Sequence, residues 1–121
     1  MKHPQWLTDL FMAIDHRDAR AFQSFLTEDT VFRFGNAEAI HGRANAEAAV
    51  AGFFSSIAGL KHDVRGIWET GDAVISHGFV TYTRHDASTL TIPFANIFMM
   101  KDSLISEYLI FADTSALYAT A

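Results

Sequence analysis

The feature that most constrains this fold is a hydrophobic period of two that begins at Leu60 and continues to Ala112. Alternation of apolar and polar residues favours β-strands with one buried face. Four such segments follow one another in the chain, at about 60–70, 73–84, 89–100 and 104–112. Their connections have the composition of hairpin turns: Gly71-Asp72, residues 85–88 and residues 101–103. The second half of the chain is therefore predicted to be an antiparallel meander.

The first half of the chain has apolar residues at helical spacing. A helix is predicted over about 4–14, a short one after the N-cap Asp18, and a third over 45–57 that is closed by Gly59. One β-type run, 30–34, separates the second helix from the third. The order α-α-β-α-β-β-β-β predicts one α+β domain over residues 1–121, with helices covering one face of a mostly antiparallel sheet.

The composition argues against several classes of partner. The net charge of −5, with no cluster of Lys or Arg, argues against nucleic acid, which is bound through basic surfaces. Cys is absent, which removes disulfides and thiolate metal sites, and no His spacing is typical of a metal site. No apolar run approaches the roughly 18 residues of a membrane span, so we expect no membrane contact and a cytoplasmic location. We also expect neither a metal nor another cofactor.

Several short motifs carry a resemblance to a known family. They are the paired carboxylates of Asp15-His16-Arg17-Asp18, the phrase FLTEDTVFRF, IHGR before the third helix, and LISEYLIFAD at the end of the meander. With the order of elements, they make the chain similar to the nuclear-transport-factor-2-like superfamily and, within it, to the SnoaL-like proteins. The resemblance implies a cone-shaped, strongly curved sheet whose mouth is closed by helices around a deep apolar pocket. The superfamily includes isomerases, cyclases, epoxide hydrolases, dehydratases and non-catalytic binders, so the fold does not select a reaction.

Three polar residues are candidates for chemistry. Asn96 is the one polar member of the apolar face of its strand, and it is either a structural amide or a donor to a ligand carbonyl. His77 has apolar neighbours and is either a core or interface residue or the proton-transfer group. Asp113 ends the last strand, where it either caps the turn into Thr114-Ser115 or closes the pocket with a raised pKa.

Two enzyme types of the same superfamily offer a comparison for this set. Asp113 matches an Asp of the Asp-Arg-Asp set of limonene epoxide hydrolases, but the strand around His77 has neither of the other two members. Asn96 matches the second oxyanion donor of steroid Δ-isomerases, whereas Arg33 stands at the place of their general-base Asp and Leu10 near that of their Tyr. The resemblance therefore implies neither epoxide hydrolysis nor ketosteroid isomerisation of those types.

Further residues are candidates for contact with a ligand. Arg33 either points to solvent or enters the cavity, where Asp113 is a candidate partner for its guanidinium. His62 shares an apolar face of its strand and is expected to be half-buried. The aromatic residues assigned to ligand binding are Trp68, Phe79, Phe94, Phe98 and Tyr108.

Two functions remain open on the sequence. The first is an enzyme that binds a small hydrophobic molecule and performs cofactor-free acid–base chemistry of the isomerase, cyclase, dehydratase or hydrolase type, with Asp113, His77 and Asn96. The second is a non-catalytic ligand-binding or dimerisation domain. Apolar residues on the other face of strand 89–100 favour a homodimer that joins through the outer face of the sheet.

Overall fold

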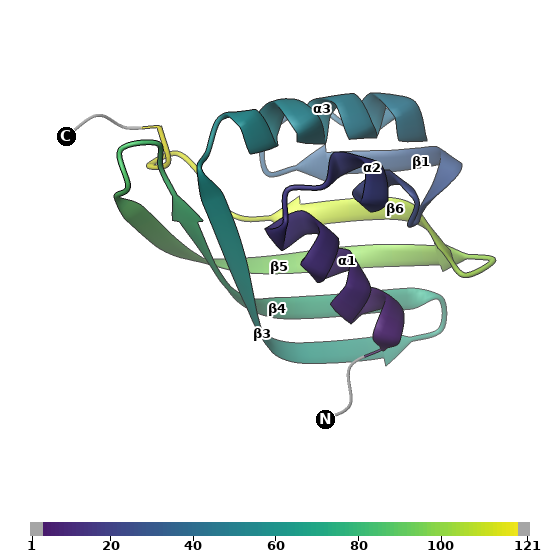
Figure 1. Cartoon of the computed structure of the whole chain (residues 1–121). Helices are drawn as coiled ribbons and strands as arrows, with labels where there is room; N and C mark the ends of the chain where they lie inside the picture. The colour runs from purple at the N-terminus through teal and green to yellow at the C-terminus, as the bar shows by residue number, and fades with distance from the viewer. Residues whose placement is uncertain (1–3, 119–121) are drawn as a thin grey trace.

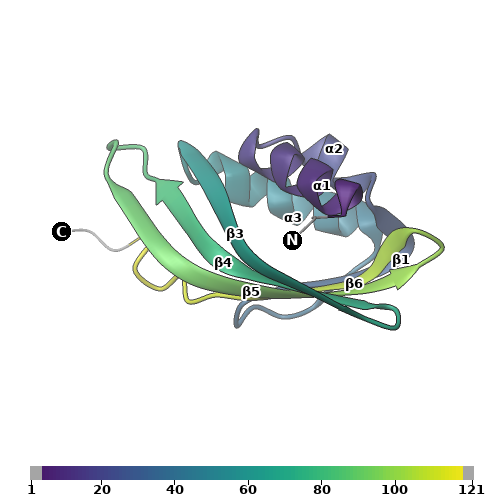
Figure 2. The same cartoon turned by 90° about the horizontal axis from the view of Figure 1, so that it is seen from below.

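The computed structural model describes residues 4–118 and has the predicted α+β architecture. The elements in chain order are α1 (Gln5–Asp15), α2 (Ala19–Gln23), β1 (Leu26–Phe34), β2 (Ile40–His41), α3 (Arg43–Ser55), β3 (Gly59–Thr70), β4 (Ala73–Thr83), β5 (Thr89–Lys101) and β6 (Leu104–Phe111). The strands form one six-stranded sheet in the order β2-β1-β6-β5-β4-β3. The helices cover one face of this sheet, which curves strongly around them (Figures 1 and 2). The predicted cone-shaped, mostly antiparallel sheet is thus confirmed.

The structure differs from the sequence prediction mainly around the first strand. β1 begins at Leu26, because the polar residues before Thr30 continue the strand instead of forming a turn, and its register with β6 is irregular between Leu26 and Val31. This pairing is parallel, and the two-residue strand β2 adds an antiparallel partner on the other side of β1. At the end of α3 the C-cap is Ser56, so Gly59 opens β3 and is not the cap.

β3 bends along its length (Figure 1), and its antiparallel pairing with β4 is irregular near the middle. The register of the two strands shifts between Val64 and Gly66, as a β-bulge produces. On β4 a Cβ at residue 78 would collide with the carbonyl oxygen of Asp63, so glycine permits the close approach of the two backbones. Before the bulge His62 faces the helices, whereas after it Trp68 pairs with Ile75 and faces away from them. The bulge therefore reverses the alternation of side chains along β3.

The core lies between the helices and the concave face of the sheet. Leu10 of α1 and Ala46 of α3 are fully buried in this core. Tyr108 occupies its centre, with its ring centroid 4.6 Å from that of Phe98 and 5.4 Å from that of Phe32. Two helices pack on the same rings, since the ring centroid of Trp6 of α1 lies 5.4 Å from that of Phe98 and the ring centroid of Phe22 of α2 lies 5.9 Å from that of Tyr108.

The last described residues close the wide end of the cone. Arg84 donates hydrogen bonds from Nε to the carbonyl oxygen of Leu117 (2.8 Å) and from Nη2 to that of Ala116 (3.0 Å). Leu117 is buried, and the Tyr118 hydroxyl lies 2.7 Å from Oγ of Ser56. These contacts hold the chain across the space between the β4–β5 hairpin and the end of α3.

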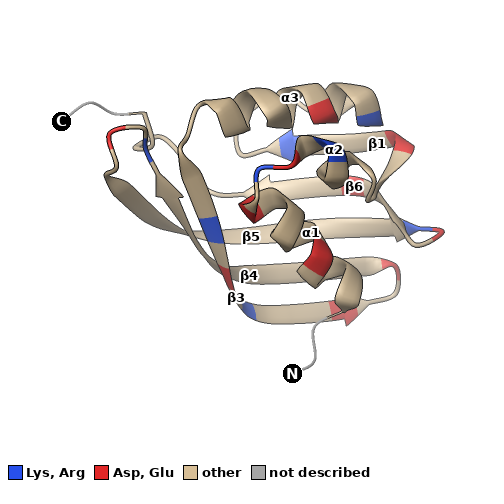
Figure 3. Cartoon of the chain, viewed as in Figure 1, with Lys and Arg blue, Asp and Glu red and all other residues tan. Residues whose placement is uncertain are grey.

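Charged residues are spread over the surface. Figure 3 shows Lys and Arg distributed over several elements, with Asp and Glu interspersed. Among residues 4–118, no helix is long and apolar enough to span a bilayer.

The first prediction concerns the bend. Gly78→Ala should destabilise the fold by about 1–3 kcal/mol, because the added methyl group forces β3 away from β4. Gly52→Ala is the matched control: it lies exposed in α3 with open space around its Cα, and alanine should stabilise the helix by up to about 1 kcal/mol. Urea unfolding measures both, and equal stability of the two variants would contradict the role given to Gly78.

Candidate functional site

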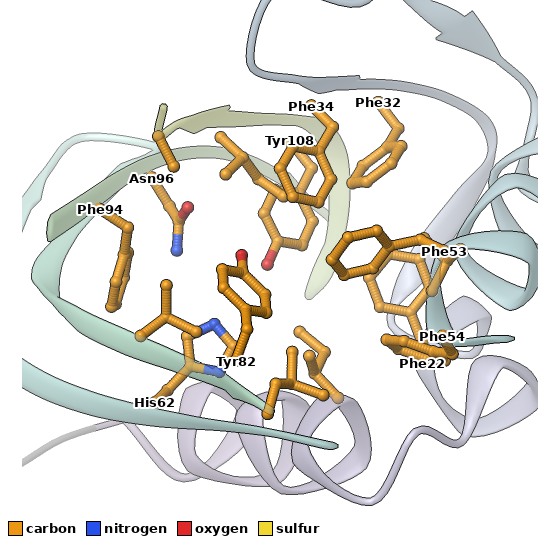
Figure 4. Close-up of a pocket in the computed structure, with 16 residues that line it drawn as sticks. Phe22, Phe32, Phe34, Phe53, Phe54, His62, Tyr82, Phe94, Asn96 and Tyr108 are labelled. Carbon is orange, nitrogen blue, oxygen red and sulfur yellow. The ribbon is translucent and has the colours of Figure 1, made fainter. Parts of the chain in front are cut away.

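An interior cavity lies between the helices and the concave face of the sheet (Figure 4). Its volume is about 40 Å³, which is room for a few water molecules. The lining side chains are mostly aromatic or aliphatic: Ile14, Phe22, Phe32, Phe34, Val50, Phe53, Phe54, Leu60, His62, Val80, Tyr82, Phe94, Asn96, Tyr108, Ile110 and Ala112. A small number of polar groups in an apolar cavity is typical of small-molecule sites.

Four lining residues bring polar atoms to this cavity: His62 from β3, Tyr82 from β4, Asn96 from β5 and Tyr108 from β6. Figure 4 shows the two phenol groups and the Asn96 amide directed into the space, with the His62 ring on the side nearest α1. Since the four strands are adjacent in the sheet, its curvature turns these groups toward a common interior.

His62 forms a close pair with Asp15, the last residue of α1. The His62 Nδ1 atom lies 2.7 Å from Oδ1 of Asp15, and the backbone N–H of His62 donates to Oδ2 at 3.1 Å. A carboxylate accepts hydrogen bonds, so this contact favours the tautomer with its proton on Nδ1 and leaves the lone pair of Nε2 free. The second ring nitrogen is directed toward the cavity in Figure 4. Asp15 and His62 therefore have the geometry of a base and the group that orients it.

The His62 ring is also held by aromatic neighbours. Its centroid lies 4.7 Å from that of Phe11 and 5.2 Å from that of Phe94. The exposed fraction of its side chain is 11%, against 25% for Asp15, so the pair lies between the interior and solvent. A fixed, half-buried imidazole at the wall of an apolar cavity is suited to proton transfer.

Asn96 faces the cavity and is bonded to its neighbouring strand. Its Nδ2 atom donates to Oγ of Ser76 at 3.2 Å, and both residues are buried. The contact fixes the orientation of the amide. Asn96 thus combines the two alternatives from the sequence, because it has a structural partner and also lines the cavity.

The phenols of Tyr82 and Tyr108 are both protonated at neutral pH. Burial raises the pKa of Tyr82 well above its ordinary value, and Tyr118 contributes in the same direction. Burial is also the main cause that raises the pKa of Tyr108, with smaller contributions from Tyr82 and Asp15. Each phenol therefore presents an O–H donor to the cavity.

The predicted ligand-binding residues divide between the interior and the surface. Phe94 and Tyr108 line the cavity. Phe98 is fully buried behind it, packed edge-on against Trp6 with the ring centroids 5.4 Å apart. Trp68 and Phe79 lie on the convex face with exposed fractions of 53% and 37%, because the bulge reverses β3 and because odd-numbered residues of β4 face outward.

The structure does not bring Asp113, His77 and Asn96 into one cavity. His77 is exposed and pairs across the sheet with Ala95, so it lies on the face opposite to Asn96. Asp113 is exposed and its Oδ1 accepts a hydrogen bond from the backbone N–H of Ser115 at 3.0 Å. Hydrogen bonds from Ser115 lower the pKa of Asp113, which is the opposite of the raised value that a buried acid requires. His77 and Asp113 border a shallow hollow on the outside of the sheet.

Arg33 also lies outside the cavity. Its side chain is exposed, and its Nε donates to the carbonyl oxygen of Ala37 at 3.1 Å, with no ion pair to Asp113 among the described residues. The alternative in which Arg33 points to solvent is the one that the structure adopts. Within residues 4–118, no three His, Asp or Glu side chains are grouped so that they could hold a metal ion.

The fold is a curved α+β cone with an apolar cavity beneath its helices, and the comparisons agree with this fold class. A family model described as the SnoaL-like domain matches residues 7–108. The chain therefore belongs to the SnoaL-like domain family. No curated protein is similar enough in sequence to count as a relative.

Solved structures share the fold at low sequence identity. TerC, co-crystallised with polyporic acid, superposes with a TM-score of 0.79 and 20% identity over 93% of this chain and 92% of that one. A putative SnoaL-like polyketide cyclase from Jannaschia sp. gives a TM-score of 0.79 and 20% identity over 92% of this chain and 85% of that one. A third structure is a hypothetical protein of Catenulispora acidiphila with a ketosteroid isomerase-like fold, in complex with trimethylamine. It gives a TM-score of 0.84 and 13% identity over 91% of this chain and 86% of that one.

The second prediction concerns Asp113. Its pKa in the folded protein should lie below the ordinary value, because the Ser115 N–H and hydroxyl stabilise the carboxylate. The associated stabilisation is present above the ordinary Asp pKa and is lost as the pH falls through the lowered folded value. Carboxyl NMR titration of the wild type against Asp113→Asn checks this. A measured pKa of Asp113 above the ordinary value for Asp would instead restore Asp113 as a candidate acid.

Proposed function

We propose that this protein binds a small apolar molecule in the interior cavity and that His62, oriented by Asp15, exchanges a proton with it without a cofactor. The observation that carries the proposal is the 2.7 Å contact between Nδ1 of His62 and Oδ1 of Asp15 at the wall of an apolar cavity. This assignment replaces His77 and Asp113 by His62 and Asp15, and it retains Asn96. The likeness in fold to a structure that holds polyporic acid and to a putative polyketide cyclase supports an organic ligand.

The proposed chemistry follows from the free Nε2 lone pair. When Nε2 takes a proton from the ligand, the ring becomes an imidazolium, and the adjacent Asp15 carboxylate stabilises that charge. Returning the proton to a second atom of the ligand completes an isomerisation, and returning it to a leaving group completes an elimination. The apolar walls strengthen these interactions, because they lower the local dielectric constant.

Binding of a drug-sized molecule requires a movement of side chains. Ligand sites for such molecules measure roughly 300–1,000 Å³, well above the 40 Å³ of this cavity. Phe34 and Phe53 line the cavity, are only partly buried, and have ring centroids 5.0 Å apart. We place the mouth at this aromatic pair, where rotation of exposed rings enlarges the cavity at the lowest cost in packing.

The third prediction tests proton transfer with 5-nitrobenzisoxazole. A base removes the C–H proton on carbon 3 of its isoxazole ring, the C–H electron pair forms the nitrile, and the N–O bond breaks to give a coloured cyanophenolate. The wild-type protein should accelerate this reaction above buffer, His62→Gln should abolish the acceleration, and Asp15→Asn should reduce it by about tenfold or more. The absorbance of the phenolate gives the rate.

The control is His77→Gln, which makes the same substitution on the convex face outside the cavity. It should leave the rate unchanged. Wild-type protein that is no faster than buffer, or a rate that depends equally on His77 and His62, would exclude His62 as the base and leave the chain a ligand-binding domain.

We also propose that the chain forms a homodimer through the convex face of the sheet. Cross-strand pairing places Trp68, Ile75, Ile97 and Leu109 in one apolar row across β3 to β6. In the next row Phe111 is 54% exposed beside Ala95. Apolar patches that lie exposed on a sheet are typical of protein–protein interfaces, and a self-complementary face suits a two-fold dimer.

The fourth prediction tests this dimer by light scattering at micromolar concentration. The wild-type protein should have twice the mass of one chain, and Ile97→Arg in the middle of the apolar row should give monomers. Met12→Arg is the control, since Met12 is also an exposed apolar residue (55%) but lies on α1 away from the convex face. A monomeric wild type would contradict the proposal.

A further inference from the structure

Two hydroxyl groups at the cavity have no hydrogen-bond acceptor among residues 4–118. The exposed fractions of Tyr82 and Tyr108 are 3% and 1%. Within residues 4–118, no hydrogen bond joins either phenol to another side chain or to the backbone. Among the described residues, the one solvent-inaccessible side-chain oxygen or nitrogen without a partner is Oγ1 of Thr27, so both phenol oxygens keep some accessible surface in the cavity and can donate to a ligand that carries an acceptor.

The two phenols lie at the same end of the cavity. Figure 4 shows their oxygen atoms directed toward one another from opposite sides of the space. Their electrostatic influence on each other agrees with this proximity, since Tyr82 contributes to the raised pKa of Tyr108. One acceptor atom placed between them can receive both O–H groups at once.

The charge of the surroundings restricts what that acceptor can belong to. None of the residues that line the cavity, all within the described part of the chain, is a Lys or an Arg. The carboxylate of Asp15 lies behind His62, and it disfavours a second anion. A carboxylate or phosphate ligand would therefore lose its hydration without gaining a cation.

We infer that Tyr82 and Tyr108 form an oxygen-binding pair and that the ligand is a neutral carbonyl compound whose oxygen sits between the two hydroxyls. The inference rests on the proposed function, because both use the same cavity. His62 lines the cavity from β3, next to β4, and so reaches the ring or chain of a ligand anchored by its oxygen. Tyr82 and Tyr108 then determine specificity, since they discriminate a ketone from a hydrocarbon of the same shape.

The fifth prediction uses cyclohexanone and methylenecyclohexane, two rings of nearly equal shape of which only the ketone has an acceptor oxygen. Affinities are measured by NMR shifts of the cavity side chains for the wild type, Tyr82→Phe and Tyr108→Phe. Each substitution should weaken the affinity for the ketone by about two- to tenfold. The affinity for the hydrocarbon should stay the same or increase. Cyclohexanecarboxylate, the anionic probe, should not bind at any concentration that saturates the ketone site.

Tyr118→Phe is the matched control, because it removes the same hydroxyl from an exposed phenol that lies outside the cavity and contacts Ser56. It should change neither affinity. The two cavity variants conserve side-chain volume, and a thermal melt of each confirms that it is folded; if one is not, the other carries the comparison.

The outcomes separate this inference from the proposed function. If both probes bind and the ratio of their affinities is the same in wild type, Tyr82→Phe and Tyr108→Phe, the oxygen-binding pair is wrong while binding in the cavity stands. Tighter binding of the carboxylate than of the ketone would also overturn the inference. If no neutral probe binds to any variant, binding in the cavity is itself wrong, and the inference fails with it.

Discussion

The β-bulge between Val64 and Gly66 is the constraint on which the rest of the structure depends. In an unbroken strand the side chains alternate strictly, so that Trp68 would share a face with His62. The extra residue reverses this alternation, so β3 supplies His62 to the cavity wall and Trp68 to the convex surface. The close backbone approach that Gly78 permits lies at the same place, since Gly78 pairs with Val64. The change of face along β3 and the close approach of β3 to β4 therefore occur together.

Once the sheet is bent, the polar groups of the cavity depend on the whole fold. The carboxylate of Asp15 comes from the end of α1, and the other groups come one from each of four neighbouring strands. Asp15 and His62, whose side chains are 2.7 Å apart, are separated by 47 positions in the chain. His62 and Asn96 are each oriented by a specific partner, Asp15 and Ser76, whereas the phenols of Tyr82 and Tyr108 have no hydrogen-bond partner among residues 4–118. The site therefore has no local sequence motif.

Sequence periodicity predicted the fold well, because alternation and helical spacing report which side of an element is buried. The same reasoning identified Asn96, since an amide on a strictly alternating apolar face stands out. It failed for His77, because periodicity shows that two faces exist but not which one meets the helices, and for Trp68, because the bulge reverses the alternation along β3. Asp15 was noticed as part of a carboxylate pair, and His62 as a half-buried residue. Only the packing of α1 over β3 shows that they belong together.

The two faces of the inner strands also relate the cavity to the proposed dimer. On β5, Asn96 points inward to Ser76 and the cavity, while its neighbours Ala95 and Ile97 point outward. A partner chain on the convex face would pack against the backs of the strands that carry Tyr82, Asn96 and Tyr108. It would supply no side chain to the cavity, but it would restrain the backbone from which these groups project. Since hydrogen-bond strength falls steeply with misalignment, a rigid outer face favours donors that stay aimed at one point of the interior.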